Sequence, residues 1–290
     1  MQLALLGTGL MGAPLARRLA QCGHSVRVWN RTHARAAEIA GDGVEACAAL
    51  PEALAGAEAA LTTLSDAGAI DAVLAVPSVL PALAGKVLVQ MGTIAPQESR
   101  ALAARLADAG VGYLEAPVLG SRPEAAKGTL LVMAGGDEAS FARCLPWLRD
   151  CGPEPVLVGP VGQAAALKLA LNQLIAALTS GFALSLGLVR REGVPVETFM
   201  GILRDSALYA PTFDKKLDRM LSGDYAGPNF PLKHLLKDVR LCREAAEADG
   251  LDTGVLAAIA RLLEAGVAQG LAEADYSALA ATMDPPAGRA

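Results

Sequence analysis

The glycine pattern at the amino terminus constrains the fold of this chain more than any other sequence feature. It reads Gly7-Thr8-Gly9-Leu10-Met11-Gly12, directly after the apolar run Leu3–Leu6 and directly before a helical stretch. Between a strand and a helix, the first glycine permits a tight turn, the second lets a phosphate approach the backbone, and the third lets the helix pack on the strand. The pattern therefore predicts a dinucleotide-binding turn in which Gly7, Gly9, Leu10, Met11 and Gly12 lie against a pyrophosphate at a helix N-terminus.

Short apolar runs recur over the first 160 residues and alternate with stretches rich in Ala, Leu and Arg, such as 11–22 and 97–110. The runs are Leu3–Leu6, Ser25–Trp29, Ala59–Leu64, Lys86–Met91, Val111–Ala116, Leu130–Ala134 and Val156–Val158. Strand–helix alternation of this kind predicts a parallel sheet that is covered by helices on both faces.

The pattern changes near Gly159-Pro160, and the periodic Ala/Leu segments that follow Gly162 contain no convincing strand. Apolar residues at helical spacing predict that this half of the chain is all-helical. We therefore predict an α/β Rossmann-type doubly wound sheet in residues 1–161, followed by an all-α domain in residues 162–290 that begins with a long interdomain helix. Residues 285–290 are expected to form a frayed tail.

Composition excludes several classes of function. A net charge of -5 leaves no basic footprint for nucleic acid, and three scattered histidines without ligand spacing give no reason to expect a metal. Five cysteines without a Cys-x-x-Cys pair favour free thiols in a reducing cytoplasm, and the amino terminus lacks the features of a signal peptide. Residues 169–189 are uncharged over a length that spans a bilayer, but their polar side chains favour a buried helix and no membrane partner.

The end of the second predicted strand indicates which dinucleotide binds. NAD enzymes place Asp or Glu about 20 residues after the glycines, where it bonds the ribose 2′-hydroxyl. This chain has Asn30-Arg31-Thr32 instead, and a guanidinium pairs well with a phosphate. We therefore predict NADP, with NADPH preferred over NADH; the alternative is that Arg31 is a solvated charge. Loops after later strands line the same crevice, which adds Leu64 and Thr93 as cofactor contacts, whereas Asp66 is equally suited to cap a helix.

Lys168 and Asn172 are the candidates for chemistry. They lie four residues apart on the first helix after the sheet, so they share one face. An ammonium group can polarise a carbonyl and donate the proton that completes its reduction, and an amide one turn later can orient it. The alternative is a lysine whose head group reaches solvent from a helix end.

Two further segments are candidates for substrate binding. Phe230–Arg240 carries Lys233 and Lys237 four residues apart, which presents cations to a carboxylate or, alternatively, forms a solvated face. Residues 115–121 form a strand that runs into a Gly120-Ser121 turn, whose backbone N–H groups are suited to hold a carboxylate. An ordinary turn is the alternative for this segment.

Together these residues resemble the β-hydroxyacid dehydrogenase family, and most closely its glyoxylate/succinic semialdehyde reductase branch. The resemblance covers nearly the whole chain, and its most branch-specific part is Phe-Pro-Leu-Lys-His-x-x-Lys-Asp at residues 230–238. It further rests on residues 7–12, 29–32, 115–118 with 120–121, and 162–168 with Asn172.

The resemblance implies a role for each matching residue. Lys168 corresponds to the catalytic lysine of the family and Asn172 to its partner. Lys237 corresponds to a second active-site lysine, with Asp238 beside the cofactor or substrate. The resemblance also implies substrate contacts from Gly120, Ser121 and Phe230 and a nicotinamide contact from Thr93.

The implied activity is NADPH-dependent reduction of a small aldehyde or 2-oxo acid, such as glyoxylate or succinic semialdehyde, with Lys168 as proton donor, in a homodimer or homotetramer. One alternative is an NAD-dependent 3-hydroxyisobutyrate-type dehydrogenase, against which residues 30–32 argue. Another is a non-catalytic cofactor-binding scaffold, against which Lys168 and Asn172 argue. An imine reductase is disfavoured because those enzymes usually lack a lysine at this position.

Two positions depart from the family pattern. Leu119 replaces a serine whose hydroxyl is expected to help hold the substrate carboxylate, and Leu184-Ser185 replaces a common Glu-Gly. The first change predicts a bulkier or more apolar substrate, and the substrate preference of Leu119→Ser tests this prediction.

Overall fold

The computed structural model describes residues 1–284, so the frayed tail predicted for 285–290 lies outside the described residues. The chain divides into two compact units, Met1–Lys168 and Leu169–Ala290. Our predicted boundary after residue 161 lies just before a long helix, α9 (Gln163–Arg191), whereas the division of the units falls within it. The start of α9 therefore belongs to the first unit and the rest of it to the second.

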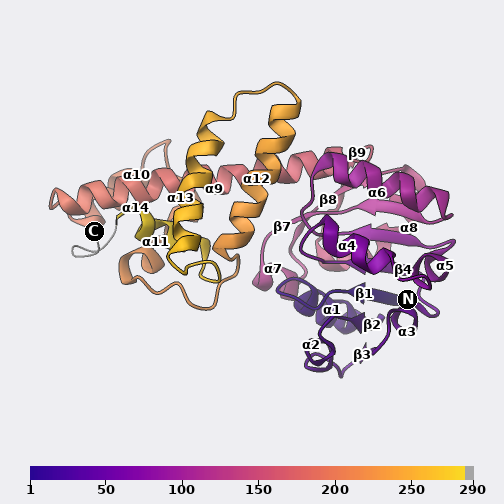
Figure 1. The fold of residues 1–290 in the computed structure, drawn as a ribbon. Helices are drawn as coiled ribbons and strands as arrows, with labels where there is room; N and C mark the ends of the chain where they lie inside the picture. The colour runs from indigo at the N-terminus through magenta and orange to yellow at the C-terminus, as the bar shows by residue number, and fades with distance from the viewer. Residues whose placement is uncertain (285–290) are drawn as a thin grey trace. The chain divides into compact units, whose positions relative to one another are not determined.

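The first unit is built around a nine-stranded sheet (Figure 1). The strands are β1 (Gln2–Leu6), β2 (Ser25–Trp29), β3 (Val44–Ala46), β4 (Ala59–Thr62), β5 (Val87–Gln90), β6 (Gly112–Glu115), β7 (Val118–Leu119), β8 (Leu131–Gly136) and β9 (Val156–Gly159). Their order is β3-β2-β1-β4-β5-β6-β8-β7, and β9 pairs with β8. All neighbours from β3 to β6 are parallel, which is the doubly wound arrangement predicted from the sequence.

The far edge of the sheet differs from the prediction of a fully parallel sheet. β8 runs antiparallel to both β6 and β7. A parallel return requires a crossover of a dozen or more residues. The connection between β7 and β8 is shorter than that and holds only the six-residue helix α7 (Arg122–Lys127), so the chain turns back as a hairpin. β3 and β7 were not predicted because neither is long enough to show a period of two.

Helices cover both faces of this sheet (Figure 1). They are α1 (Gly12–Gln21), α2 (His33–Ala37), α3 (Leu50–Leu54), α4 (Ala67–Leu74), α5 (Val79–Leu83), α6 (Pro96–Asp108), α7 and α8 (Glu138–Cys151). Because side chains alternate along a strand, Leu3 and Leu5 of β1 enter one core, while Ala4 and Leu6 enter the other. Both faces of the parallel strands are therefore apolar, as the continuous runs in the sequence indicated.

The second unit is all-helical, as predicted. It holds the larger part of α9, α10 (Val196–Arg204), α11 (Pro211–Ser222), α12 (Leu232–Ala248), α13 (Gly254–Ala268), a 3₁₀ turn (Tyr276–Ala278) and α14 (Leu279–Met283). Leu235 and Val239, four residues apart on α12, pack with Ile259 and Leu263 on α13. Buried Leu and Ile side chains of this kind contribute about 1.5–3 kcal/mol each.

By length and composition alone, α9 is apolar enough to cross a membrane. A core helix of a soluble protein can be equally long and apolar, and 44% of the most apolar stretch of α9 is buried. Within the second unit its exposed side chains include Leu174, Leu178, Leu184 and Leu188, of which Leu184 is 62% exposed. This set, here called the leucine stripe, is an apolar surface on one helix.

Candidate active site

The three glycines of the first loop have different surroundings. Gly7 follows β1 with a φ of +103°, a conformation that favours glycine. A Cβ at Gly12 would lie 1.9 Å from the Gly7 carbonyl oxygen, so α1 packs on this turn only because Gly12 has no side chain. A Cβ at Gly9 would meet no protein atom within 4 Å. The space beside Gly9 is therefore not used for packing, and it fits the close approach of a pyrophosphate.

The N-terminus of α1 lies at the same loop. Its N-cap residue, Met11, makes no side-chain hydrogen bond to the helix, and its first turn holds no acidic residue. Leu10 and Met11 are both half-buried beside this end. The first N–H groups of a helix lack partners within the helix and attract anions, so this end fits a dinucleotide phosphate.

Asn30 makes two hydrogen bonds that connect the glycine loop to the segment after β2. Its Oδ1 accepts the Thr8 N–H at 3.2 Å, and its Nδ2 donates to the Thr32 carbonyl at 3.0 Å. Arg31 and Thr32 are exposed. Asn30 therefore links Thr8 to Thr32, and the cofactor contacts of Asn30, Arg31 and Thr32 stay predictions.

The last residues of three neighbouring strands are polar, and they lie at the carboxyl ends of the strands, where doubly wound sheets bind their ligands. Thr62, Gln90 and Glu115 stand in register on β4, β5 and β6 and are at most 2% exposed. Thr62 Oγ1 and Gln90 Nε2 have no hydrogen-bond partner among residues 1–284. Buried polar atoms usually bond to protein, water or ligand, so these two fit a site that holds a polar molecule.

The loops after β4 and β5 carry the remaining predicted cofactor contacts. Leu64 and Thr93 are half-buried. The Leu64 Cδ2 atom would lie 3.0 Å from a Cβ at Gly7, which places Leu64 at the glycine loop. Asp66 caps α4, because its Oδ1 accepts the Ala69 N–H at 2.8 Å. The alternative interpretation of Asp66 as a helix cap is therefore confirmed.

The turn that follows β7 is less open than predicted. Ser121 is the N-cap of α7, and its N–H and its hydroxyl both donate to Glu124 Oε2 at 2.8 Å. We expected free backbone N–H groups here, but the one on Ser121 is occupied. A substrate carboxylate at Gly120-Ser121 would therefore compete with the carboxylate of Glu124 for these donors.

Lys168 lies in the second turn of α9 and is 8% exposed. Lysine is rarely buried this far unless its ammonium group is paired or used in chemistry. Asn172 follows one turn later on the same helix and is 2% exposed. The helical spacing places both side chains on one face, as the sequence predicted.

In the second unit, Asn172 joins a buried polar cluster with Asp238 and Lys237 of α12. Asn172 Nδ2 donates to Asp238 Oδ2 at 2.7 Å, and Lys237 Nζ lies 2.9 Å from Asp238 Oδ1. Asp238 is 3% exposed, whereas the Lys237 side chain is 25% exposed. The other end of the Asn172 amide, Oδ1, is also buried. This oxygen has no hydrogen-bond partner among residues 1–284. The free oxygen can accept a hydrogen bond from an ammonium or a hydroxyl group.

The other residues of the 230–240 segment lie around this cluster. Burial, and then the charges of Lys233 and Lys237, lower the pKa of His234, so it is neutral near pH 7. Phe230 is half-buried and packs edge-on against Tyr276 with 5.8 Å between ring centroids. Within the described chain, no group of three or more His, Cys, Asp and Glu is placed to hold a metal.

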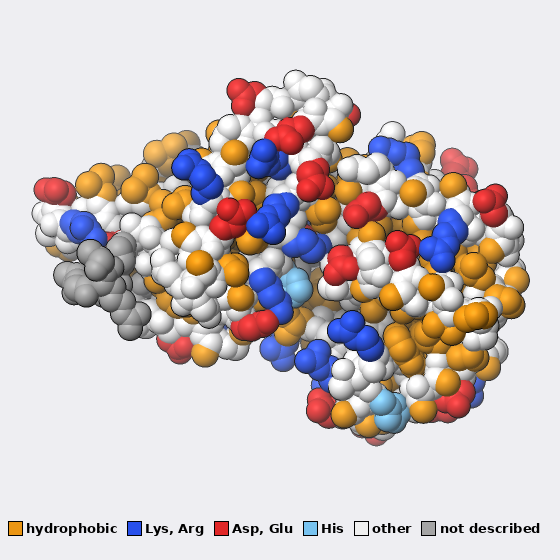
Figure 2. Space-filling model, in the orientation of Figure 1, with side chains coloured by type: hydrophobic (Ala, Val, Ile, Leu, Met, Phe, Trp, Pro, Cys, Tyr) orange, Lys and Arg blue, Asp and Glu red, His pale blue; other side chains and the backbone are white. Residues whose placement is uncertain are grey.

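The outer part of α12 fits the solvated-face alternative. Lys233 pairs with Glu273, and Arg240 with Glu264 at 2.8 Å. Figure 2 shows basic and acidic side chains intermingled over α12 and α13. One helix therefore carries both a solvated charged face and, at Lys237 and Asp238, the buried cluster.

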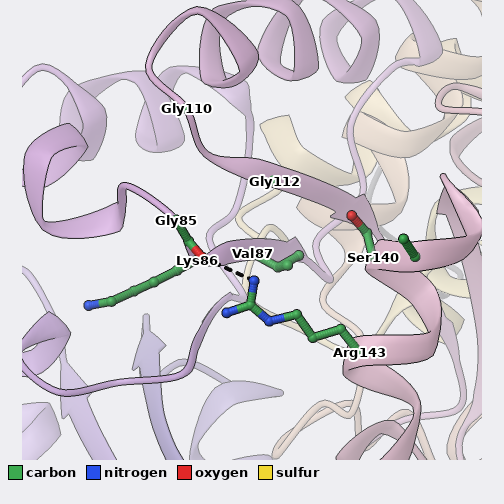
Figure 3. Close-up of a pocket in the computed structure, with 8 residues that line it drawn as sticks. Gly85, Lys86, Val87, Gly110, Gly112, Ser140 and Arg143 are labelled. Atoms are coloured by element: carbon green, nitrogen blue, oxygen red, sulfur yellow. Dashed lines mark hydrogen bonds between the residues drawn. The ribbon is translucent and has the colours of Figure 1, made fainter.

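A pocket of about 280 Å³ in the first unit is not part of this site (Figure 3). It lies at the starts of β5 and β6, between Lys86 and Arg143, whose Nη1 donates to the Gly85 carbonyl at 3.0 Å. Ligands of doubly wound sheets bind at the opposite ends of the strands. Partial burial lowers the pKa of Lys86, so a half-buried lysine with a lowered pKa does not by itself mark the active site.

Known proteins similar to this chain cover both units. The family model described as the NAD binding domain of 6-phosphogluconate dehydrogenase matches residues 2–159. The model described as NAD-binding of NADP-dependent 3-hydroxyisobutyrate dehydrogenase matches residues 162–283. The chain belongs to the β-hydroxyacid dehydrogenase family.

Relatives within the family act on different small acids. Glyoxylate/succinic semialdehyde reductase 2 of Arabidopsis thaliana is 30% identical over 96% of this chain and 78% of its own length. The 2-(hydroxymethyl)glutarate dehydrogenase of Eubacterium barkeri is 31% identical over 96% of this chain and 93% of its own length. The structure of Mycobacterium tuberculosis 3-hydroxyisobutyrate dehydrogenase with L-serine has a TM-score of 0.87 and 25% identity, covering 97% of this chain and 98% of that one.

Membership of the β-hydroxyacid dehydrogenase family confirms the predicted fold class and the resemblance drawn from the motifs. The protein is an NAD(P)-dependent oxidoreductase that acts on the CH–OH group of hydroxy acids.

Sequence reasoning did not predict the contacts of two acidic residues, Glu115 and Glu124. The contact between Ser121 and Glu124 has a local signal, because Ser-x-x-Glu before a helix is a capping box. The contacts of Glu115 have none, since its partners lie up to 50 residues away along the chain.

Proposed function

We propose that this β-hydroxyacid dehydrogenase reduces small aldehyde or 2-oxo acids, such as glyoxylate or succinic semialdehyde, with NADPH. The observation that carries the proposal is the buried Lys168, one helical turn before an Asn172 whose amide is oriented by Asp238. Bound NADPH supplies a hydride from its nicotinamide ring. Lys168 donates a proton to the carbonyl oxygen as the hydride reaches carbon, so the product is an alcohol and the lysine is left as an amine.

Asn172 acts as a hydrogen-bond acceptor in this proposal. One N–H of its amide donates to Asp238, and its buried Oδ1 is available to the Lys168 ammonium or the substrate hydroxyl. This polarity favours the protonated lysine that reduction requires. Lys237, already paired with Asp238, supplies a cation for the substrate carboxylate. The substrate contacts of Gly120 and Ser121 stay predictions.

The preference for NADPH rests on Arg31 and Thr32. Both are exposed beyond the end of β2, and the loop holds Asn30 as its brace. A guanidinium that binds a phosphate in bidentate fashion favours the 2′-phosphate of NADPH over the hydroxyl of NADH.

We further propose that a second copy of the chain covers the leucine stripe of α9. Its four leucines are between 38% and 62% exposed, and exposed apolar patches on soluble proteins usually mark contact surfaces. Light scattering after size-exclusion chromatography tests this, with Leu184→Glu and Leu188→Glu expected to shift the protein toward a smaller assembly. A monomer in the unmodified protein contradicts it.

The activity is tested by following NADPH and, separately, NADH absorbance with glyoxylate, succinic semialdehyde, tartronate semialdehyde and 3-hydroxyisobutyrate. Lys168→Ala is expected to lower kcat for the aldehyde acids at least about 100-fold, the lower range for a general acid. Lys86→Met is the matched control. Lys86 is also partly buried in the first unit, but it lies at the start of β5, away from the carboxyl ends of the strands.

Each outcome separates one alternative. Oxidation of 3-hydroxyisobutyrate with NAD, without reduction of aldehyde acids, favours the dehydrogenase alternative. Tight NADPH binding without turnover favours the scaffold. Full activity of Lys168→Ala would remove the assigned proton donor.

A further inference from the structure

The carboxylate of Glu115 binds the first turn of α9. Glu115 is the last residue of β6 and is 1% exposed. Its Oε1 accepts the N–H groups of Gly162, Ala164 and Ala165 at 2.8, 2.8 and 3.2 Å. These are helix N-terminal donors without partners inside the helix, so one side chain from the sheet satisfies most of the first turn.

The second oxygen of Glu115 is held from another side. Oε2 accepts a hydrogen bond from Ser99 of α6, and Ser99 Oγ lies 2.8 Å from the Tyr113 hydroxyl. Gly135 of β8 leaves the space for this carboxylate, because a Cβ there would lie 2.4 Å from Glu115 Oε1. The carboxylate is thus bound by Ser99 of α6 and lies against Gly135 of β8, so it is a rigid point of attachment for α9.

The attachment determines where Lys168 lies. Lys168 follows Ala164 by four residues and Ala165 by three, so it stands one turn above the bound N–H groups on the same side of the helix. A shift or rotation of the first turn of α9 therefore moves Lys168 as well, because the helix is continuous between them.

We propose that Glu115 is a positioning residue for the reaction: it fixes the start of α9 and, through it, the place of Lys168. This inference rests on the proposed role of Lys168 as proton donor. A carboxylate is needed here, because a negative group bound by three N–H donors at a positive helix end holds more strongly than a neutral acceptor.

A role in stability alone would give a different pattern. Asp137 provides the comparison, because it caps α8 through the Ser140 N–H at 2.8 Å and the Ser140 hydroxyl at 2.7 Å. Its removal weakens a helix of the same unit that carries none of the proposed active-site residues. Asp137→Ala therefore controls for loss of a helix cap without loss of the position of Lys168.

The test uses Glu115→Gln, Lys168→Ala, the double variant and Asp137→Ala. Glu115→Gln keeps the shape of the side chain and removes its charge. Amide hydrogen exchange should become faster in the peptide that covers residues 160–168, and kcat for the aldehyde acid should fall about 10- to 100-fold, the size of a small misplacement of a catalytic group. The KM for NADPH should stay within about twofold in the same variant. Because partial unfolding also lowers the apparent kcat at constant KM, kcat is expressed per NADPH-binding site, counted by titration.

The double variant shows whether Glu115 acts through Lys168. If it does, adding Glu115→Gln to Lys168→Ala lowers kcat no further. A kcat within twofold of the parent in Glu115→Gln, or a loss no larger than in Asp137→Ala, overturns the inference while leaving the proposed function intact. Full activity of Lys168→Ala overturns both.

Discussion

Two helix N-termini in the first unit use the same physics in opposite ways. At α1 a residue without a capping side chain, Met11, leaves the first turn to an incoming phosphate, and Gly9 leaves the space for it. At α9 the anion belongs to the protein, since Glu115 already occupies the N–H groups. Of these two ends, only that of α1 has N–H groups that are not already bound by a carboxylate of the fold, so it is the one suited to an anionic ligand.

The largest expected effect is at the N-terminus of α1, here called the open end because no carboxylate of the protein occupies it. Gly9→Asp places a fixed negative charge where we propose that the pyrophosphate binds, and juxtaposed like charges cost about 4 kcal/mol, or about 1,000-fold in the Kd for NADPH. The Tm should change little, because a Cβ at Gly9 meets no atom within 4 Å. Fluorescence titration with NADPH measures the Kd. Unchanged affinity would show that the two helix ends do not differ in this way.

The N-terminus of α9, here called the closed end, is tested by removing the Glu115 carboxylate that occupies it. Glu115→Ala leaves three backbone N–H groups and Ser99 without their acceptor. A buried donor without a partner costs about 1–3 kcal/mol, so the free energy of unfolding should fall by about 3 kcal/mol or more. Urea denaturation measures the change. A loss below about 1 kcal/mol would indicate that water replaces the carboxylate.

The cofactor preference sharpens the comparison at the open end. Arg31→Ala removes the guanidinium proposed for the 2′-phosphate, so the Kd for NADPH should rise about tenfold, the lower range for a hydrogen bond to a charged group. The Kd for NADH should not change, because NADH lacks this phosphate. Equal effects on both cofactors would contradict the assignment of Arg31.

A third helix end gives the smallest effect. The Ser140 N–H, and then its hydroxyl, hold the pKa of Asp137 below its usual 3.8. The carboxylate therefore stabilises the fold fully above pH 3.8, and this contribution is lost as the pH falls through the lower folded value. Asp137→Ala should lower the free energy of unfolding by about 1 kcal/mol at pH 7, as for other N-caps. The difference from the parent should shrink in urea titrations below pH 3.8; a constant difference would contradict it.

Local patterns in the sequence predicted most of the fold. The glycines at residues 7–12 and the apolar runs gave β1, α1 and the parallel part of the sheet, because each depends on neighbours within a few residues. The antiparallel return of β8 was missed, since it depends on the length of the β7–β8 connection and not on any residue within a strand.

The candidate site was predicted unevenly for the same reason. Lys168 and Asn172 share a helical face, which spacing shows directly. The bond from Asn172 to Asp238 joins residues 66 apart along the chain, and only the folded structure shows which amide atom is left free. The use of Asn30 as a brace for Thr8 likewise depends on how two loops meet.

The space beside Gly135 has a consequence for how this chain can change during evolution. Glu115 fills the volume where a side chain at residue 135 would stand, at 2.4 Å from the carboxylate oxygen. The constraint runs in one direction: an alanine at 135 requires a shorter side chain at 115, because a long acid at 115 requires glycine at 135. Residues 20 positions apart should therefore be inherited as a pair and covary among related sequences.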